Sequence, residues 1–164
     1  LVKVSHVAAR LDFSQFDVTL KGFEGDPTVV FDEAKFVNLQ QNGKIVEGDA
    51  SVNVKDGAFL NRSNRIGTRW TDMGTAYGYA NQYRQDSEMN TALYVKFTVD
   101  GRTFEKTYPI NPAGITKEVD HNGIKGGYLY DIKVRWTITP DWGDSTIEFY
   151  TRDWVHNSIP EIVL

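Results

Sequence analysis

The sequence predicts an all-β chain that folds as an antiparallel two-sheet β-sandwich. Three observations predict this fold: an excess of β-branched and aromatic residues, several segments in which apolar and polar residues alternate, and Gly- and Asn/Asp-containing turns between those segments. Val, Ile, Thr and the aromatic residues total 61 of the 164 residues, against 19 for Leu, Ala and Met. Because branched and ring side chains suit a pleated sheet better than a helix, this balance disfavours an all-helical fold.

The clearest predicted element is a hairpin over residues 91–108, with its turn at Asp100-Gly101. This pair accepts the positive φ values of a two-residue hairpin turn. Counting outward from the turn places Phe97 opposite Phe104 and gives the ribbon one apolar and one polar face. Lys106 falls on the apolar face, where it either extends along an edge with its amine in water or marks a break in the register.

The C-terminal half predicts a second hairpin. Residues 128–138 alternate cleanly and are expected to form a long central strand. After a turn, residues 146–154 resume the alternation, with Ile147 and Phe149 facing inward.

The N-terminal half predicts shorter strands, and a change of apolar phase near His6 indicates a bulge or a change of sheet there. Residues 56–90 lack clear periodicity, but a structureless loop of that length is unusual in a compact domain, so we expect order within it. The remaining expected strands cover the ranges 16–20, 28–39, 44–47 and 50–55.

Length and composition limit the class of protein. The 164 residues suit one β-sandwich domain over residues 1–164. The net charge of −4 provides no positive field for nucleic acid or anionic lipid, and no apolar run approaches the roughly 18 residues of a spanning helix. The absence of Cys excludes disulfides and thiolate chemistry. A chain that opens on Leu1 is expected of a processed or trimmed product.

Patterns typical of catalysis or metal binding are weak. Candidate acid/base carboxylates such as Glu105 and Glu148 fall on outward, polar faces of predicted strands. Asp141 and Asp144 lie in a turn, which explains them without a calcium ion. The histidines lie far apart in sequence, without a second ligand at metal-binding spacing: His6, His121 and His156. The sequence therefore predicts a protein that is not an enzyme and that has no cofactor and no metal site.

The segment 56–90 carries aromatic residues interleaved with arginines. A sugar-binding surface needs exposed aromatic planes with hydrogen-bonding neighbours. Two interpretations stay open: the chain is a secreted or surface carbohydrate-binding module, or these rings cover one open end of the sandwich. The candidate sugar-binding residues are Trp70, Tyr77, Tyr79 and Tyr83.

The end of the chain is apolar and β-prone beyond the last predicted strand. An extended segment of this kind pairs either with another chain or with its own sheet, and the sequence leaves both alternatives open. The tail comprises residues 155–164 and follows Trp154. The candidate assembly interface consists of Trp154, Val155, Ile159, Ile162, Val163 and Leu164.

Four segments in order resemble the C-terminal domain of Bacteroidetes fimbrillins, the subunits of strand-exchange pili. They read LVKVSHVAARLDF, LYVKFTVDGRTFEKTYPI, GGYLYDIKVRWTI and TIEFYTRDW. In that family an opening strand contains Ala-Arg, a hairpin closes on Tyr-Pro-Ile, a strand contains Tyr-x-Tyr-Asp, and a terminal strand ends near Trp. The matching positions are Ala9-Arg10, Tyr108-Pro109-Ile110, Tyr128 to Ile132, and Asp153-Trp154.

The resemblance implies a transthyretin-like, Greek-key sandwich in a structural subunit of a cell-surface fimbria. Such subunits are exported to the outer membrane as lipoproteins, mediate adhesion, and assemble when a strand of one subunit completes the sheet of its neighbour. The implied partners are other pilus subunits or further copies of the chain, and glycans or proteins of host or bacterial surfaces. Because family members carry an N-terminal domain before this one, the resemblance implies the C-terminal domain of a larger subunit, with residues 155–164 as its donor strand.

Overall fold

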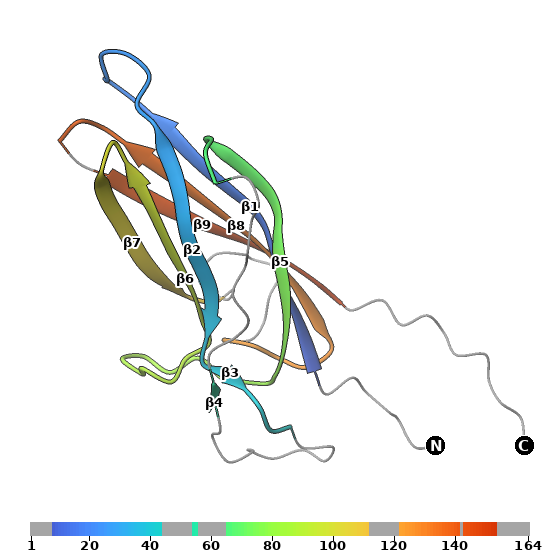
Figure 1. Ribbon diagram of the computed structural model, residues 1–164. Coiled ribbons are helices and arrows are strands. Elements are labelled where there is room, and N and C mark those ends of the chain that lie inside the picture. The colour runs from blue at the N-terminus through green and yellow to red at the C-terminus, as the bar shows by residue number, and fades with distance from the viewer. Residues whose placement is uncertain (1–7, 44–53, 56–64, 112–121, 142, 154–164) are drawn as a thin grey trace, which may run out of the picture.

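The computed structural model describes residues 8–43, 54–55, 65–111, 122–141 and 143–153, with 54–55 and 143–153 described at the level of the backbone. This part of the chain is built from strands and contains no helix (Figure 1). In chain order the strands are β1 (Ala8–Leu20), β2 (Val29–Val37), β3 (Leu39–Gln40), β4 (Val54–Lys55), β5 (Arg69–Tyr79), β6 (Ala92–Val99), β7 (Arg102–Pro109), β8 (Tyr128–Ile138) and β9 (Gly143–Asp153).

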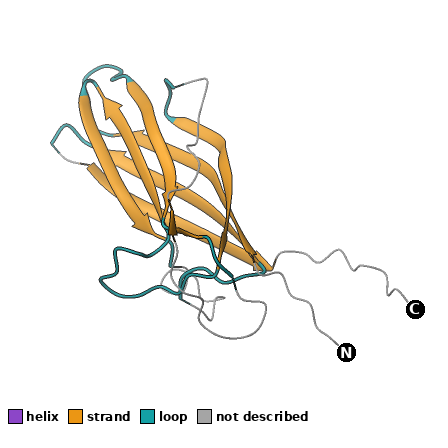
Figure 2. Cartoon of the chain, turned by 60° about the horizontal axis from the view of Figure 1, so that its bottom comes forward, coloured by secondary structure: helices purple, strands orange, loops and turns teal. Residues whose placement is uncertain are grey.

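Two sheets face each other, as the sequence predicts (Figure 1; Figure 2). Sheet A has the strand order β5-β1-β8-β9, sheet B has the order β2-β6-β7, and β3 and β4 form a small separate ladder. The all-β sandwich is therefore confirmed. One ladder departs from a purely antiparallel arrangement, because β1 and β8 pair in parallel.

Strand β1 unites two segments that the sequence treats separately. A register shift between Phe13 and Gln15 interrupts its pairing with both β5 and β8. Leu11 and Phe13 are buried before the shift, and Phe16 and Val18 are buried after it. The bulge thus returns the apolar side chains to the core after a change of phase. It lies later in the chain than the irregularity expected near His6, which is outside the described residues.

The β6–β7 hairpin has the predicted register throughout. Asp100 and Gly101 have φ values of 45° and 83°, and Phe97 lies opposite Phe104. Lys106 keeps its place in the ladder and lies exposed at the edge, with its Nζ 5.3 Å from the centre of the Tyr108 ring. Of the two alternatives for this lysine, the edge position is the one observed.

The second predicted hairpin is also present. Strand β8 has the bounds expected from its alternation, and β9 begins at Gly143, before the expected residue 146. Positions 147 and 149 lie opposite Val134 and Ile132, both of which are fully buried.

The expected strands of the N-terminal half are found in part. Strand β2 lies within the expected range 28–39, and β3 begins at the last residue of that range. Strand β4 lies within the expected range 50–55. The expected strand 44–47 lies outside the described residues. The segment without periodicity contains β5.

Aromatic rings fill the space between the sheets. Phe16 of β1 is fully buried, and its ring centre lies 5.3 Å from that of Trp70 and 5.4 Å from that of Phe97. Phe31 of β2 approaches the same ring from sheet B at 5.8 Å. Each such side chain stabilises the fold by about 1.5–3 kcal/mol through burial, so this cluster fixes how the two sheets face each other.

Candidate strand-pairing edges and aromatic surface

The chain enters and leaves the described fold at the same end of the sandwich (Figure 2). Strand β9 is an edge strand of sheet A, and its last residue, Asp153, lies opposite Tyr128 at the beginning of β8. The candidate assembly residues follow directly and lie outside the described residues: Trp154, Val155, Ile159, Ile162, Val163 and Leu164.

The outer edge of β2 is covered by the segment that leads into β5. Ile66 forms an isolated bridge with Val30, and the Phe31 N–H donates to the Arg65 carbonyl at 2.7 Å. The Arg65 guanidinium also donates to the Asp32 carboxylate at 3.2 Å. This edge therefore has backbone partners within its own chain.

The outer edge of β5 is irregular. Asp72 has a φ of 51°, in the left-handed region that a regular strand does not use. Opposite it, the ladder with β1 skips from Phe13–Gly74 to Gln15–Thr71. A bulge bends an edge and discourages pairing with another strand.

The outer edge of β7 is regular. All its residues, Arg102 to Pro109, pair with β6 without a register shift, and no described strand lies on its other side. The exposed side chains on this strand include Glu105 and Lys106. Three edge strands have described side chains: β2, β5 and β7. Of these three, β7 is the one that combines regular geometry with no described strand on its outer side.

A charged cluster lies on the outer face of sheet A. The carboxylate of Asp17, whose side chain is 11% exposed, accepts hydrogen bonds from the Arg69 guanidinium at 2.8 and 3.3 Å. The Arg135 guanidinium lies 3.9 Å away on its other side. The hydrogen bond to Asp17 raises the pKa of Arg69 above its ordinary value. Because the three residues come from β1, β5 and β8, the cluster joins three adjacent strands and is a structural feature.

The predicted sugar-binding residues do not lie together on one exposed surface. Trp70 is 5% exposed and its ring belongs to the core, so its face cannot stack on a sugar, contrary to the expectation of an exposed plane. Tyr77 is 56% exposed on β5, opposite Arg10 of β1. Tyr79, two residues along the strand, and Tyr83, in the following loop, are half-buried.

The loop after β5 is ordered by buried amides, as its length leads us to expect. The Asn81 side chain, 6% exposed, donates to the Thr91 hydroxyl and to the Met89 carbonyl, both at 3.0 Å. The Asn90 side chain accepts from the Arg84 N–H at 2.9 Å. Asparagines in a polar segment suggest turns, so the sequence alone does not reveal this network.

The two carboxylates considered for hydrolysis belong to different sheets. The Glu105 carboxylate on β7 accepts a hydrogen bond from the Tyr94 hydroxyl at 2.7 Å, which raises the pKa of Tyr94 to about 12. Glu148 lies on β9, opposite Lys133. The strands that carry the two positions are therefore not neighbours in one sheet. Within the described ranges, we find neither a cluster of side chains that could hold a metal ion nor a helix long and apolar enough to cross a membrane.

These features define a β-sandwich in which one edge of sheet B has no described strand partner and in which the C-terminal segment follows the edge strand β9. No protein-family model matches the chain, and no curated protein matches it.

Solved structures do match, and they share this fold. A candidate cell adhesion protein from Parabacteroides distasonis superposes with a TM-score of 0.68 at 20% identity, over 92% of this chain and 52% of that one. A candidate cell adhesion protein from Bacteroides eggerthii gives a TM-score of 0.55 at 15% identity, over 92% of this chain and 56% of that one.

A third structure is the tip fimbrial protein from Porphyromonas gingivalis with a C-terminal truncation. It gives a TM-score of 0.54 at 14% identity, over 93% of this chain and 53% of that one. The fold is thus that of fimbrial and candidate adhesion proteins, in agreement with the resemblance to fimbrillins, and the chain spans about half the length of these neighbours.

Proposed function

We propose that this chain is part of a structural subunit of a cell-surface fimbria and is not an enzyme. The observation that carries the proposal is the shared sandwich fold, found in a tip fimbrial protein and in candidate cell adhesion proteins. Because the chain spans about half of those proteins, we assign it to one domain of a larger subunit, the C-terminal domain by its resemblance to fimbrillins.

In this proposal the subunit assembles by β-strand exchange, and residues 155–164 act as the donor strand. Strand β9 is an edge strand that ends at Asp153, so the donor segment follows it directly. An extended apolar segment that joins the sheet of another subunit gains main-chain hydrogen bonds and buried area. The partners are other pilus subunits or further copies of this chain.

Truncation tests the donor role. The full chain and a chain ending at Trp154 are compared at equal concentration by size-exclusion chromatography with light scattering. We expect the full chain to form oligomers and the truncated chain to be a monomer with an unchanged unfolding midpoint. Oligomers that persist after truncation would contradict the proposal, and a truncated chain that unfolds would make the tail an intrinsic strand.

A triple substitution provides a control of matched length. Ile162→Ser, Val163→Ser and Leu164→Ser together keep the backbone of the tail but remove its apolar side chains. If pairing depends on burial of these side chains, the variant assembles less than the full chain while its unfolding midpoint stays the same.

The proposed location is the cell surface, with export to the outer membrane, and the proposed role there is adhesion to glycans or proteins of host or bacterial surfaces. Antibody labelling of intact cells tests the location. Signal that appears only after the cells are lysed would contradict it.

Carbohydrate binding is a second candidate function, and the exposure of Tyr77 favours it. Arg10 and Asp12 lie on the neighbouring strand, where the Arg10 Nε donates to the Asp12 carboxylate at 2.9 Å. A glycan array tests this function with Tyr77→Ala as the variant and Tyr94→Ala, on sheet B, as the control. Binding that Tyr77→Ala abolishes and Tyr94→Ala retains would support a sugar site at Tyr77.

A further inference from the structure

Sheet A has four strands and sheet B has three, and β7 is the edge strand of sheet B that has no described strand on its outer side. The Phe16 ring of β1 lies 5.8 Å from the Phe31 ring of β2. The Trp136 ring of β8 lies 5.0 Å from the Phe97 ring of β6 and 6.0 Å from the Phe104 ring of β7.

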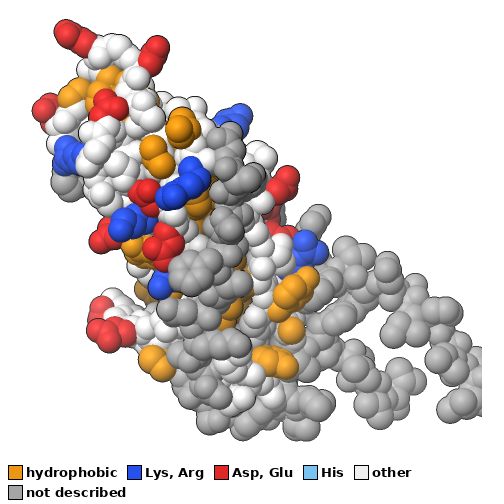
Figure 3. Space-filling model, viewed as in Figure 1, with side chains coloured by type: hydrophobic (Ala, Val, Ile, Leu, Met, Phe, Trp, Pro, Cys, Tyr) orange, Lys and Arg blue, Asp and Glu red, His pale blue; other side chains and the backbone are white. Residues whose placement is uncertain are grey.

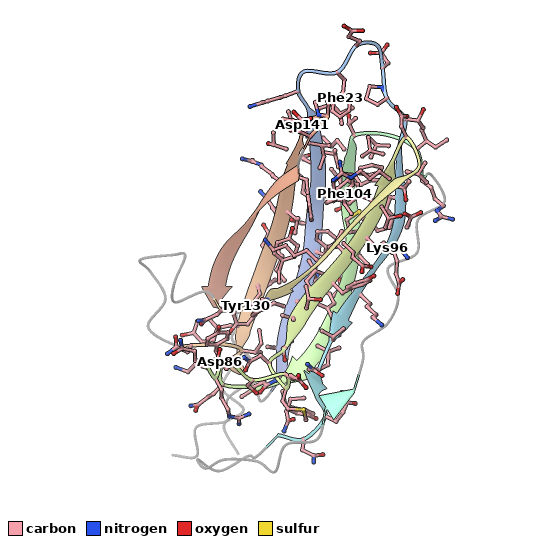
Figure 4. The ribbon with its side chains drawn as sticks, turned by 90° about the vertical axis from the view of Figure 1, so that its left-hand side faces the viewer. Phe23, Asp86, Lys96, Phe104, Tyr130 and Asp141 are labelled. Carbon is pink, nitrogen blue, oxygen red and sulfur yellow. The ribbon has the colours of Figure 1, made fainter. Side chains whose placement is uncertain are left out.

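The core is incompletely covered at this edge. Phe104 stacks on Phe97 with ring centres 5.4 Å apart, but Phe97 is fully buried and Phe104 only half-buried. Figure 4 faces this side of the sandwich and labels Phe104 on β7. The neighbouring Trp136 is 6% exposed, and its Nε1 has no hydrogen-bond acceptor in the described part of the chain. An added strand would cover the open side of Phe104.

The backbone of β7 presents regularly spaced donors and acceptors along this edge. Val99 and Arg102 flank a two-residue turn and therefore form a hydrogen-bonded pair. From Arg102 onward, every second residue of β7 thus directs its backbone N–H and C=O groups toward β6. The bond from the Ile110 N–H to the Thr91 carbonyl, 2.9 Å, continues this alternation. The residues between them direct their N–H and C=O groups away from β6: Thr103, Glu105 and Thr107.

We propose that the edge of β7 binds the C-terminal segment of a second copy of the chain, which adds to sheet B as a strand parallel to β7. This inference rests on the donor role proposed above and specifies the acceptor, the direction and the register. Ile159 lies beside Phe104, which sets Glu161 beside Lys106 and Val163 beside Tyr108.

Charge and polarity favour this register. The inward row of β7 is Arg102, Phe104, Lys106 and Tyr108, so an aromatic residue lies between two exposed cations. Figure 3 shows that acidic and basic side chains are mixed on the surface of the molecule. In the tail, every second residue from position 159 gives the order apolar, acidic, apolar: Ile159, Glu161 and Val163. Side chains two residues apart share a face of a strand, so the two rows match.

Pro160 selects the parallel direction. In an antiparallel strand with Ile159 beside Phe104, Pro160 would face Thr103 in a hydrogen-bonded pair, although proline has no N–H to donate. In a parallel strand with Ile159 beside Phe104, the hydrogen bonds to β7 are made by Ile159 and Glu161. The ring nitrogen of Pro160 then points away from β7. With Ile159 facing the core, the tail therefore pairs without losing a hydrogen bond only in the parallel direction.

The parallel direction in turn selects a second copy. Strands β7 and β9 both run toward the end of the sandwich at which the chain leaves, because Arg102 follows the turn at the opposite end and Asp153 lies opposite Tyr128. A chain's own tail would first have to return along the full length of β7, which rises roughly 26 Å over its eight residues. Residues 154–156 reach at most about 10 Å. The donor must therefore come from another molecule.

Disulfide cross-linking between two single-cysteine chains tests the register, since the chain has no cysteine of its own. The parallel register aligns Thr107 with Ile162, whereas the antiparallel one aligns Thr107 with His156. Full-length Thr107→Cys is mixed with Ile162→Cys or, as the matched control, with His156→Cys, and each mixture is oxidised. We expect at least a tenfold excess of the mixed dimer for the Ile162→Cys partner.

The other outcomes overturn the inference in distinguishable ways. Preferential cross-linking to His156→Cys would mean an antiparallel strand. A monomeric cross-linked product from the double variant Thr107→Cys, His156→Cys would mean that the tail folds back on its own chain. If neither pair cross-links although truncation still abolishes assembly, the donor role stands and the β7 acceptor is wrong. If truncation leaves assembly unchanged, the donor role itself fails.

Charge reversal provides an independent check. Lys106→Glu or Glu161→Lys alone should weaken assembly by up to about fivefold, the size expected for one exposed ion pair. The double variant, Lys106→Glu with Glu161→Lys, should restore it. Single effects that add in the double variant would contradict the pairing of these two residues.

Discussion

The Tyr130 hydroxyl accepts a hydrogen bond from the Lys125 N–H at 2.7 Å and so fixes the turn that leads into β8. Tyr130 is fully buried, and its burial raises the pKa of its hydroxyl above the usual value. This is the second tyrosine of the Tyr-x-Tyr-Asp segment in which the sequence resembles fimbrillins. The structure thus gives that residue a local role, because its hydroxyl provides a partner for a backbone N–H in the turn before β8.

Tyr130→Phe should lower the free energy of unfolding by about 1–2 kcal/mol, because it removes the bond and leaves the Lys125 N–H without this acceptor. Chemical denaturation measures the change. Tyr94→Phe is the matched control: its hydroxyl bonds to the exposed Glu105, so its loss should matter less. Equal destabilisation by the two variants would contradict a special role for the buried hydroxyl.

Gly123 cannot accept a side chain without movement of the loop that follows β5. A Cβ atom there would lie 2.3 Å from the Tyr83 nitrogen and 2.4 Å from the Asn81 oxygen, and its φ is +71°. Gly123→Ala should therefore cost about 3 kcal/mol or more of unfolding free energy. Gly25→Ala is the control, because Gly25 has a φ of +88° but no atom within 4 Å, and it should cost only about 1 kcal/mol. Similar losses would show that the contact with Asn81 and Tyr83 is unimportant.

Trp70→Ala should destabilise the chain by about 3–5 kcal/mol, as expected for a large buried ring. Its ring centre lies 5.3 Å from that of Phe16 and 5.9 Å from that of Phe31, so the substitution opens a cavity between the sheets. Tyr77→Ala, on the exposed face of β5, should change stability by less than about 0.5 kcal/mol. Thermal and denaturant unfolding compare the two. A small effect of Trp70→Ala would contradict the core position of this ring, which also makes that variant unsuitable as a test of sugar binding.

Local signals explain which elements the sequence predicts. The β6–β7 hairpin is encoded within one short stretch, because the turn at Asp100-Gly101 sets the register of every pair. Strand β5 leaves no such pattern: its bulge separates the buried Trp70, Met73 and Ala76 by three residues each, a spacing that resembles neither a strand nor a loop.

Long-range pairings explain what the sequence does not predict. The parallel ladder between β1 and β8 joins residues more than a hundred positions apart, and the alternation within each strand is the same for either direction of pairing. For the same reason the tail residues were identified from the sequence as β-prone, whereas the regular edge of β7 became a candidate acceptor only once the strand order was known.

Tyr94 gives a prediction for alkaline pH. The hydrogen bond to Glu105 is the main cause that raises its pKa from 10.0 to about 12, and burial and the charge of Glu33 contribute less. Because the pKa is raised in the folded state, the stability from this hydroxyl is fully present below about pH 10 and is lost as the pH rises toward 12. Tyrosinate absorbance should show a tyrosine that titrates near pH 12 and whose step is absent in Tyr94→Phe, separate from that of the buried Tyr130, whose pKa is also raised. Glu105→Gln should return the pKa of Tyr94 toward 10, and the control Glu33→Gln should move it less. If the step that is absent in Tyr94→Phe survives Glu105→Gln unchanged, the assignment to this pair is contradicted.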